Sequence, residues 1–175
     1  MPPSERPVPP SLPTAAQVPP ELRPLRRWVG WRAQWDEAKG KWRKPPCSPV
    51  TGEHVGPVSK NAEHFLTFEE ALEGTKKHHL DGVGFVFLRE DGFVGIDFDD
   101  CRDQQGVIHP TVVTWLRWFP TYQEVSPSGT GIHIIGRGKL AKALNATPLE
   151  KESGVTVELY AWDRYFTFTG QEVKL

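Results

Sequence analysis

Apolar and polar side chains alternate in three short segments of the chain, residues 94–99, 131–134 and 155–159. Successive side chains of a β-strand point to opposite faces, so each segment is predicted to be a strand with one apolar face. The opposite faces carry ionisable side chains: Asp97 and Asp99 in the first segment, His133 in the second and Glu158 in the third. The pattern predicts three half-buried strands whose polar sides form one candidate site.

The remaining chain mixes further strands with two helices. Strands are predicted at 26–35, 42–44, 82–88, 122–126 and 165–169, and residues 45–60 as a loop. Thr67 followed by Glu70 is a capping box that opens a helix to about residue 79, and Pro110 suits the first position of a second helix to about residue 119. Turn residues at 90–92 and 163–164 predict hairpins over 82–99 and 155–169. Together these elements predict an α+β fold with a largely antiparallel sheet.

The first 24 residues differ from the rest because nine of them are proline. Such a segment buries too little apolar surface to offset its ordering entropy, which predicts a disordered, proline-rich tail over residues 1–24. Residues 25–175 are then predicted to form one compact domain.

Composition narrows the class of protein further. No apolar run approaches the roughly 18 residues that cross a bilayer, so a membrane partner is not expected. Cys47 and Cys101 are the two cysteines and make neither a disulfide framework nor a CxxC zinc signature. A cytoplasmic location is therefore predicted.

Charge is unevenly distributed, although the formal net charge is only −1. Residues 23–44 hold eight basic and two acidic side chains, a net +6, and four of the seven tryptophans. Basic side chains interleaved with aromatic ones can neutralise phosphates and stack on bases. Equally, the segment can be a strand pair with tryptophans in the core and charges in water, and the sequence leaves both interpretations open.

The Asp97-x-Asp99 pair is an unusual feature for a strand. Carboxylates are poor strand residues and repel one another when clustered, unless solvent or a cation screens them. Magnesium prefers carboxylate oxygens, and two such ions about 4 Å apart can promote phosphoryl transfer. The alternative is a strand end at which Asp97, Asp99 and Asp100 face water.

Residues 126–133, Ser-Pro-Ser-Gly-Thr-Gly-Ile-His, form a loop that leads into a strand. Its glycines allow a ligand to approach the backbone, and its hydroxyl and amide groups can meet phosphate oxygens. No Gly-Lys-Ser/Thr follows, so this is not the phosphate loop of an ATPase. The alternative is a tight turn between strands.

These motifs resemble, in order and spacing, the archaeo-eukaryotic primase superfamily, in particular the primase-polymerase N-terminal domains of phage, plasmid and mobile-element replication proteins. The resemblance rests on residues 95–99, on the loop ending at His133, 34 residues after Asp99, and on Glu158, 25 residues further, followed by residues 164–170. Trp31, residues 44–46 and the helix after Thr67 also look like that family. The resemblance covers about residues 25–170.

The resemblance implies an RRM-like antiparallel-sheet catalytic core packed against a second small α/β layer. It implies that Asp97, Asp99 and Glu158 bind two Mg²⁺ or Mn²⁺ ions. The nucleotide's phosphates are expected at His133, with Ser126 and Ser128 as further contacts. Arg164, Lys44 and Lys60 are expected to contact polyphosphate or template; for Arg164 a structural turn residue is the alternative.

The function predicted from the resemblance is template-directed DNA or RNA synthesis from nucleoside triphosphates on a single-stranded DNA template with a primer. Relatives that start primers usually continue into a helical accessory domain and often a helicase. The chain is therefore expected to be part of a longer protein, a catalytic fragment that by itself extends primers but does not initiate them. One alternative is a metal-dependent nuclease, since three carboxylates also suit phosphodiester hydrolysis. Another is a non-catalytic RRM-like module that binds nucleic acid.

Overall fold

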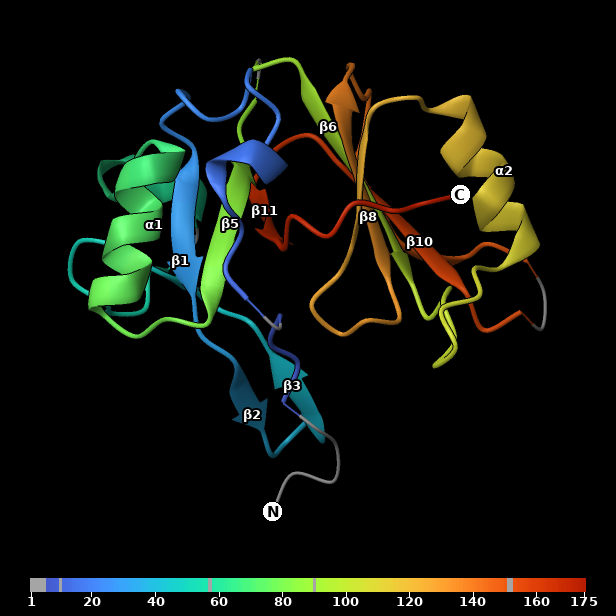
Figure 1. Ribbon diagram of the computed structural model, residues 1–175, viewed down its shortest axis with the longest axis horizontal. Helices are drawn as coiled ribbons and strands as arrows, with labels where there is room; N and C mark the ends of the chain where they lie inside the picture. The colour runs from blue at the N-terminus through green and yellow to red at the C-terminus, as the bar shows by residue number, and fades with distance from the viewer. Residues whose placement is uncertain (1–5, 10, 57, 90, 151–152) are drawn as a thin grey trace.

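Two antiparallel sheets stand face to face, and one α-helix covers the outer side of each (Figure 1). The computed structural model describes residues 6–9, 11–56, 58–89, 91–150 and 153–175. The first sheet has the order β11 (Arg164–Phe168), β5 (Gly82–Phe87), β1 (Trp28–Trp31), β4 (Pro46–Cys47). The second has the order β7 (Tyr122–Val125), β8 (Ile132–Arg137), β6 (Phe93–Asp99), β10 (Thr156–Tyr160), β9 (Leu144–Pro148). The predicted α+β class and antiparallel pairing are confirmed, while the RRM-like character of the core stays a prediction.

The first sheet packs against α1 (Phe68–Lys77), which begins at the predicted capping box. The Thr67 hydroxyl accepts a hydrogen bond from the backbone N–H of Glu70, and the Glu70 carboxylate accepts one from the backbone N–H of Thr67. The helix buries Phe68 beside Trp28, whose ring also meets Phe85 and Phe168 edge to face at 5.0 to 5.3 Å. These aromatic contacts form the centre of the first core.

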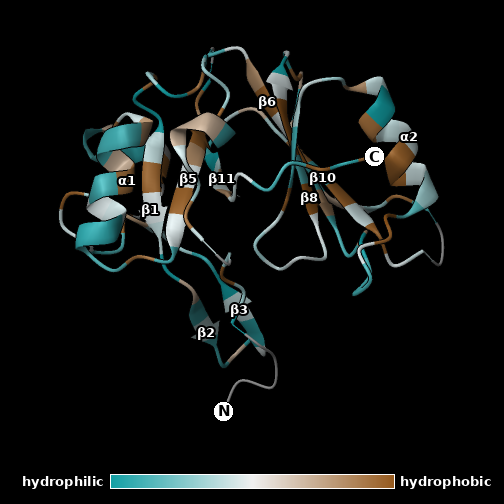
Figure 2. Ribbon diagram, in the orientation of Figure 1, coloured by the Kyte–Doolittle hydropathy of each residue, from teal (hydrophilic) through white to brown (hydrophobic). Residues whose placement is uncertain are grey.

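The second sheet packs against α2 (Pro110–Trp118), which begins with the predicted proline. Its buried residues Val112 and Leu116 meet the apolar face of β6, β8 and β10. That face holds Ile96, Phe98, Ile132, Ile134 and Val157, as the alternating pattern predicts, and Figure 2 shows the apolar colour running along these strands. In the described part of the chain, neither helix is long and apolar enough to cross a bilayer.

Both hairpins predicted over 82–99 and 155–169 are wrong, because each pair of strands separates into different sheets. β5 lies in the first sheet and β6 in the second, and β10 and β11 divide in the same way. Every residue of β5 is buried, so this strand takes the interior of a sheet, between β1 and β11. The connection from β5 to β6 is shaped by Asp91. Its side chain accepts hydrogen bonds from the backbone N–H groups of Leu88 and Phe93. A turn sequence specifies the change of direction, but burial decides which strands pair.

Several smaller boundaries also differ from the prediction. The segment 26–35 is divided between β1 and β2 (Gln34–Asp36), and β2 pairs only with β3 (Lys41–Arg43) in a separate hairpin. The loop 45–60 contains β4, and the mixed segment before Val155 contains β9. Both missed strands lie at sheet edges and contain proline, which weakens their sequence signal. The short 3₁₀ helices are Ala15–Gln17, Val58–Lys60 and Ala62–His64.

The structure corrects the prediction of a disordered tail for residues 11–24. Val18 and Leu22 belong to the first core, with exposures of only 2% and 1%. The Leu22 carbonyl accepts a hydrogen bond from the Trp28 indole N–H, and the Gln17 side chain donates one to the Gly170 carbonyl. Two buried aliphatic side chains and these hydrogen bonds offset the ordering cost that the proline content suggested. Residues 1–5 and 10 lie outside the described residues.

Gly95 of β6 lies close against two aromatic rings of the first sheet, and we predict that a side chain here destabilises the fold. A Cβ atom here would lie 2.5 Å from the Phe166 ring and 2.7 Å from the Phe87 ring. Gly95→Ala should cost about 1–3 kcal/mol by overpacking and lower Tm by about 2–4 °C per kcal/mol. Gly56→Ala is the matched control, since its Cβ would meet nothing nearer than 3.8 Å. Equal Tm values for the two variants, measured by calorimetry, would contradict this contact.

Candidate active site

Four ionisable side chains stand in one row across the second sheet. The strand register places Glu124 of β7 opposite His133 of β8, His133 opposite Asp97 of β6, and Asp97 opposite Glu158 of β10. All four belong to the face opposite the apolar residues that contact α2. The predicted gathering of Asp97, His133 and Glu158 on one sheet face therefore corresponds to the observed register.

A polar cavity of about 220 Å³ opens between this row and the first sheet. Its second wall is formed by β11, the edge strand of the first sheet, and by Lys44, which follows β3. Tyr165 of β11 donates its hydroxyl hydrogen bond to the Lys44 carbonyl and so joins these two parts. The lining residues are Lys44, Asp97, Asp99, Ser126, Ser128, His133, Tyr165, Phe166 and Thr167.

Asp97 is the carboxylate with the most unusual surroundings. Its side chain is 19% exposed, and its Oδ1 atom is buried without a hydrogen-bond partner, 3.6 Å from His133 Nε2. The pKa of Asp97 is raised to about 6, mainly by burial and also by the nearby Asp99 and Glu158, against the opposite effects of His133 and Lys44. Burial and Glu158 also raise the pKa of Asp99. An acid with an unpaired buried oxygen among other acids is a favourable place for a cation.

Lys44 is a half-buried cation that lines the cavity. Burial lowers the pKa of Lys44, while Asp97 and Asp99 act in the opposite direction. A lysine that stands this close to two aspartates can balance part of their charge. The same position makes it available to an anionic ligand that enters the cavity.

His133 is held by Glu124, a residue that the sequence analysis missed. Glu124 is fully buried, and its Oε1 lies 3.1 Å from His133 Nδ1. Its Oε2 accepts four hydrogen bonds at 2.8 to 3.1 Å, from Tyr122 OH, Thr169 N, Thr169 Oγ1 and Gly170 N. Since these groups all donate, Glu124 acts as an acceptor, and His133 Nδ1 carries the hydrogen toward it. The other ring nitrogen, Nε2, is then directed to the Asp97 side.

This arrangement also determines the direction in which the pKa of His133 is shifted. Burial lowers the pKa of His133, but Asp97 and the hydrogen bond that His133 donates to Glu124 outweigh burial and bring the pKa above its usual value. The imidazole also stacks on Phe166 at 4.8 Å, which fixes its plane.

The sequence contained a signal for Glu124. Glu124 lies two residues before the candidate Ser126 in the same predicted strand, so strand alternation puts both side chains on one face.

The loop before β8 contributes the hydroxyl groups. Ser126 Oγ and Ser128 Oγ lie 2.9 Å apart, and both line the cavity with His133. Gly131 has to be glycine for steric reasons, since a Cβ there would lie 2.8 Å from Ser126 Oγ and 2.9 Å from the Phe98 carbonyl. The predicted phosphate-contacting loop is thus adjacent to the carboxylates.

Three candidate residues lie outside the cavity lining. Glu158 accepts a hydrogen bond from Tyr160, and the Arg164 guanidinium lies 4.9 Å from the centre of the Tyr160 ring. Arg164 therefore reaches the row indirectly, through Tyr160. Lys60 ends a 3₁₀ helix and is exposed. The other six candidates line the cavity together. Glu158 and Arg164 lie beside it, and Lys60 belongs to a separate 3₁₀ helix.

Among the described residues, no three His, Cys, Asp or Glu side chains converge closely enough to form a ready-made metal site. Asp97 and Asp99 share the cavity, while Glu158 faces Asp97 across the β6–β10 pair.

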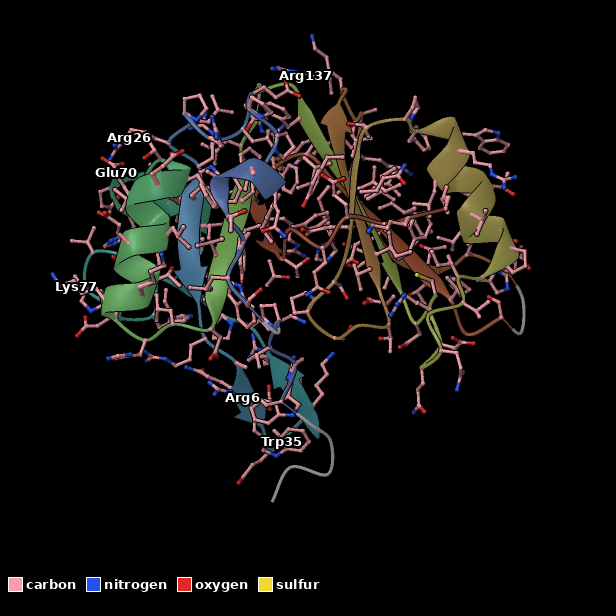
Figure 3. The ribbon with its side chains drawn as sticks, in the orientation of Figure 1. Arg6, Arg26, Trp35, Glu70, Lys77 and Arg137 are labelled. Atoms are coloured by element: carbon pink, nitrogen blue, oxygen red, sulfur yellow. The ribbon has the colours of Figure 1, made fainter. Side chains whose placement is uncertain are left out.

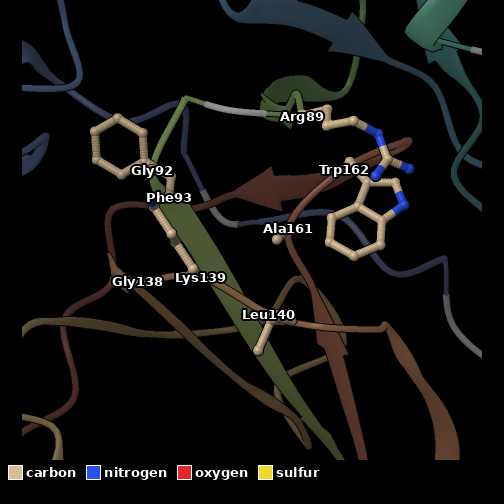
Figure 4. A pocket seen from close by; sticks show the side chains of 8 residues that line it. All are labelled: Arg89, Gly92, Phe93, Gly138, Lys139, Leu140, Ala161 and Trp162. Carbon is tan, nitrogen blue, oxygen red and sulfur yellow. The ribbon is translucent and has the colours of Figure 1, made fainter.

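A second cavity, of about 310 Å³, lies where the chain crosses between the sheets (Figure 4). Its lining includes Arg89, whose guanidinium lies 4.5 Å from the centre of the Trp162 ring, together with Phe93 and Lys139. No carboxylate belongs to its described lining. This cavity therefore does not share the carboxylate chemistry of the cavity at Asp97.

A comparison with known proteins identifies the family of the chain. The chain is 30% identical over 159 residues to the DNA primase-polymerase of Nitratiruptor phage NrS-1, a match that covers 87% of this chain. This chain has a primase-polymerase domain. The domain spans 20% of the length of that relative. No protein-family model matches it, and membership of the wider archaeo-eukaryotic primase superfamily stays a prediction.

Proposed function

We propose that the primase-polymerase domain catalyses template-directed nucleotidyl transfer, in which a primer 3′-hydroxyl attacks the α-phosphate of a bound nucleoside triphosphate. The observation that carries the proposal is the shared cavity of Asp97 and Asp99 with Lys44, His133, Ser126 and Ser128. Acidic residues suited to metal ions stand beside cationic and hydroxyl groups suited to phosphates. The name of the relative, a DNA primase-polymerase, supports the same reaction.

The carboxylates fit hard divalent cations. Asp97 has a buried oxygen without a partner, and the pKa values of Asp97 and Asp99 are raised, so a cation would relieve both conditions. Asp97, Asp99 and Glu158 would hold two Mg²⁺ or Mn²⁺ ions. Bound there, the ions would supply activation of the attacking hydroxyl and stabilisation of the leaving oxygen.

The remaining polar residues would hold the triphosphate. His133, with Nδ1 bound to Glu124, presents Nε2 to the cavity, and Ser126 and Ser128 present hydroxyl groups. Lys44 adds a cation opposite them. Arg164, which lies against Tyr160, and the exposed Lys60 would contact polyphosphate or template farther out. A helicase or a helical accessory domain is a further proposed partner.

A primer-extension assay tests the proposal. The domain is incubated with a labelled primer on a single-stranded DNA template, with nucleotides and Mg²⁺ or Mn²⁺. Metal-dependent lengthening of the primer supports nucleotidyl transfer. Shortening of the strand without added nucleotides would identify a nuclease instead. Binding without product of either kind would leave a nucleic-acid-binding module.

Thermal stability gives an independent prediction about the cavity. A nucleoside triphosphate with Mg²⁺ at 100 times its Kd should add about 2.7 kcal/mol of stability and raise Tm by about 5–10 °C. The same nucleotide with Asp97→Asn/Asp99→Asn protein should give a much smaller shift. Equal shifts for the two proteins, measured by scanning fluorimetry, would place the nucleotide elsewhere.

A further inference from the structure

The β2–β3 hairpin separates from the rest of the basic, tryptophan-rich segment. Trp28 and Trp31 of β1 are fully buried, as the core interpretation expected. Trp35 and Trp42 instead lie on the hairpin, which pairs with neither large sheet and projects from the body near the chain's N-terminus (Figure 1). The core interpretation therefore holds for Trp28 and Trp31, and the hairpin is the part of the segment for which nucleic-acid binding stays open.

The tryptophan pair gives the hairpin its own internal packing. Trp35 stands directly opposite Trp42 in the register, with the ring centres 5.7 Å apart and the planes at 71°. An isolated two-stranded hairpin is marginal in water, and an aromatic pair across the strands stabilises it. Figure 3 shows Trp35 on this projecting part of the molecule. The pair therefore stabilises the hairpin from within.

The other face and the tip of the hairpin carry positive charge. Lys39, Lys41 and Arg43 are exposed, against Asp36 and Glu37. Arg43 forms an ion pair with Asp36 at 3.4 Å. Lys39 and Lys41 take part in no ion pair with the described residues, so their charge is available to a partner.

The hairpin continues directly into the candidate active site. Arg43 ends β3, and the next residue, Lys44, lines the cavity with Asp97 and Asp99. Lys41 and Lys44 are three positions apart, which is about 10 Å of extended chain. Nucleic acid that leaves the cavity past Lys44 along the hairpin would come within reach of Arg43, Lys41 and Lys39.

We infer that the β2–β3 hairpin is a contact surface for single-stranded DNA that enters or leaves the active site, with Lys39 and Lys41 binding phosphates. This inference rests on the proposed function for the identity of the strand. The contacts are to the backbone of the DNA, so they are independent of sequence and sensitive to salt.

A binding measurement with matched variants tests the inference. A fluorescein-labelled oligothymidylate is titrated with wild-type protein, with Lys39→Ala/Lys41→Ala, and with Lys76→Ala/Lys77→Ala as the control. The control removes the same charge from exposed positions on α1, and Figure 3 shows Lys77 there, away from the hairpin. All four positions are exposed, so both variants should keep the wild-type Tm.

The hairpin variant is expected to bind roughly tenfold more weakly at low salt, and its slope of log affinity against log salt should fall by about 1.4 for two lost phosphate contacts. The control should change both values far less. Equal losses in the two variants, or no loss in either, would overturn the inference.

Primer extension separates this inference from the proposed function. At saturating nucleotide, the hairpin variant should show a raised KM for primer–template and an unchanged kcat. Active extension with unaltered DNA binding by the hairpin variant overturns the hairpin inference alone. Weakened binding in the hairpin variant, together with no extension by the wild-type protein, overturns the proposed function alone.

Discussion

Asp97→Asn/Asp99→Asn protein is expected to lose primer extension by at least about 10³-fold. The two substitutions remove the negative charge that would hold the metal ions, while the size of each side chain is nearly unchanged. Because the pKa of Asp97 is raised to about 6 in the folded protein, mainly by burial, its ionised form at pH 7.5 weakens the fold. The metal-free variant should therefore be at least as stable as the wild-type protein.

Two measurements check this expectation. Initial rates of extension are compared with Tm values in the presence of a chelator, so that lost activity is separated from lost folding. Glu53→Gln/Glu73→Gln is the matched control, because both glutamates are exposed and neither lines the cavity. Extension by the aspartate variant at more than a tenth of the wild-type rate would refute the assignment of these carboxylates.

Glu124→Ala is expected to have the largest effect on stability. The substitution deprives four donors of their buried acceptor, namely His133 Nδ1, Tyr122 OH, Thr169 N and Gly170 N, while Thr169 Oγ1 keeps the Val125 carbonyl. Loss of one partner from a buried ionic network costs about 3–5 kcal/mol, which corresponds to a Tm about 10 °C lower or more.

Glu124→Gln separates the structural role from the positioning of His133. The amide oxygen can take over the four donors of Oε2, so the loss of stability should be only about 1–2 kcal/mol. The amide NH₂ then faces His133 Nδ1, which has to accept, and the imidazole hydrogen moves to Nε2. The kcat/KM for nucleotide should fall by roughly 10–100-fold.

The ¹⁵N chemical shifts of His133 report this change of tautomer directly. Glu172→Gln serves as the control, because Glu172 is an exposed neighbour of Glu124 outside the cavity lining. Wild-type kinetics and an unchanged tautomer in Glu124→Gln would limit Glu124 to a structural role.

The sequence was sufficient for the faces of the central strands. Period-two alternation placed Asp97, His133 and Glu158 opposite the apolar residues, and the register aligns them in one row. The capping box at Thr67 and the proline at residue 110 located both helices. These signals are local, because a strand's alternation and a helix's first turn depend on neighbouring residues alone.

The pairing of strands was decided only by the tertiary structure. β5 and β6 are joined by a turn sequence typical of a hairpin, yet they enter different sheets, and so do β10 and β11. Because β11 belongs to the first sheet, its Phe166 stacks on the ring of His133 in the second sheet. Tyr165 of the same strand lines the cavity between the sheets. Burial of a whole strand between two neighbours is a property of the assembled core, which no local pattern contains.

Glu124 and the N-terminal segment show the same division. Alternation could mark Glu124 as a polar side chain of its strand, but only the fold gathers Thr169 and Gly170 around its carboxylate. Val18 and Leu22 are separated by prolines in a segment of low hydrophobicity, and they enter the core because Trp28 and Gly170 offer partners there. The sequence by itself determined which side chains are polar, which are apolar and which strand face each occupies. Long-range packing determined which of them meet, because contacts between distant residues depend on the whole chain closing around one core.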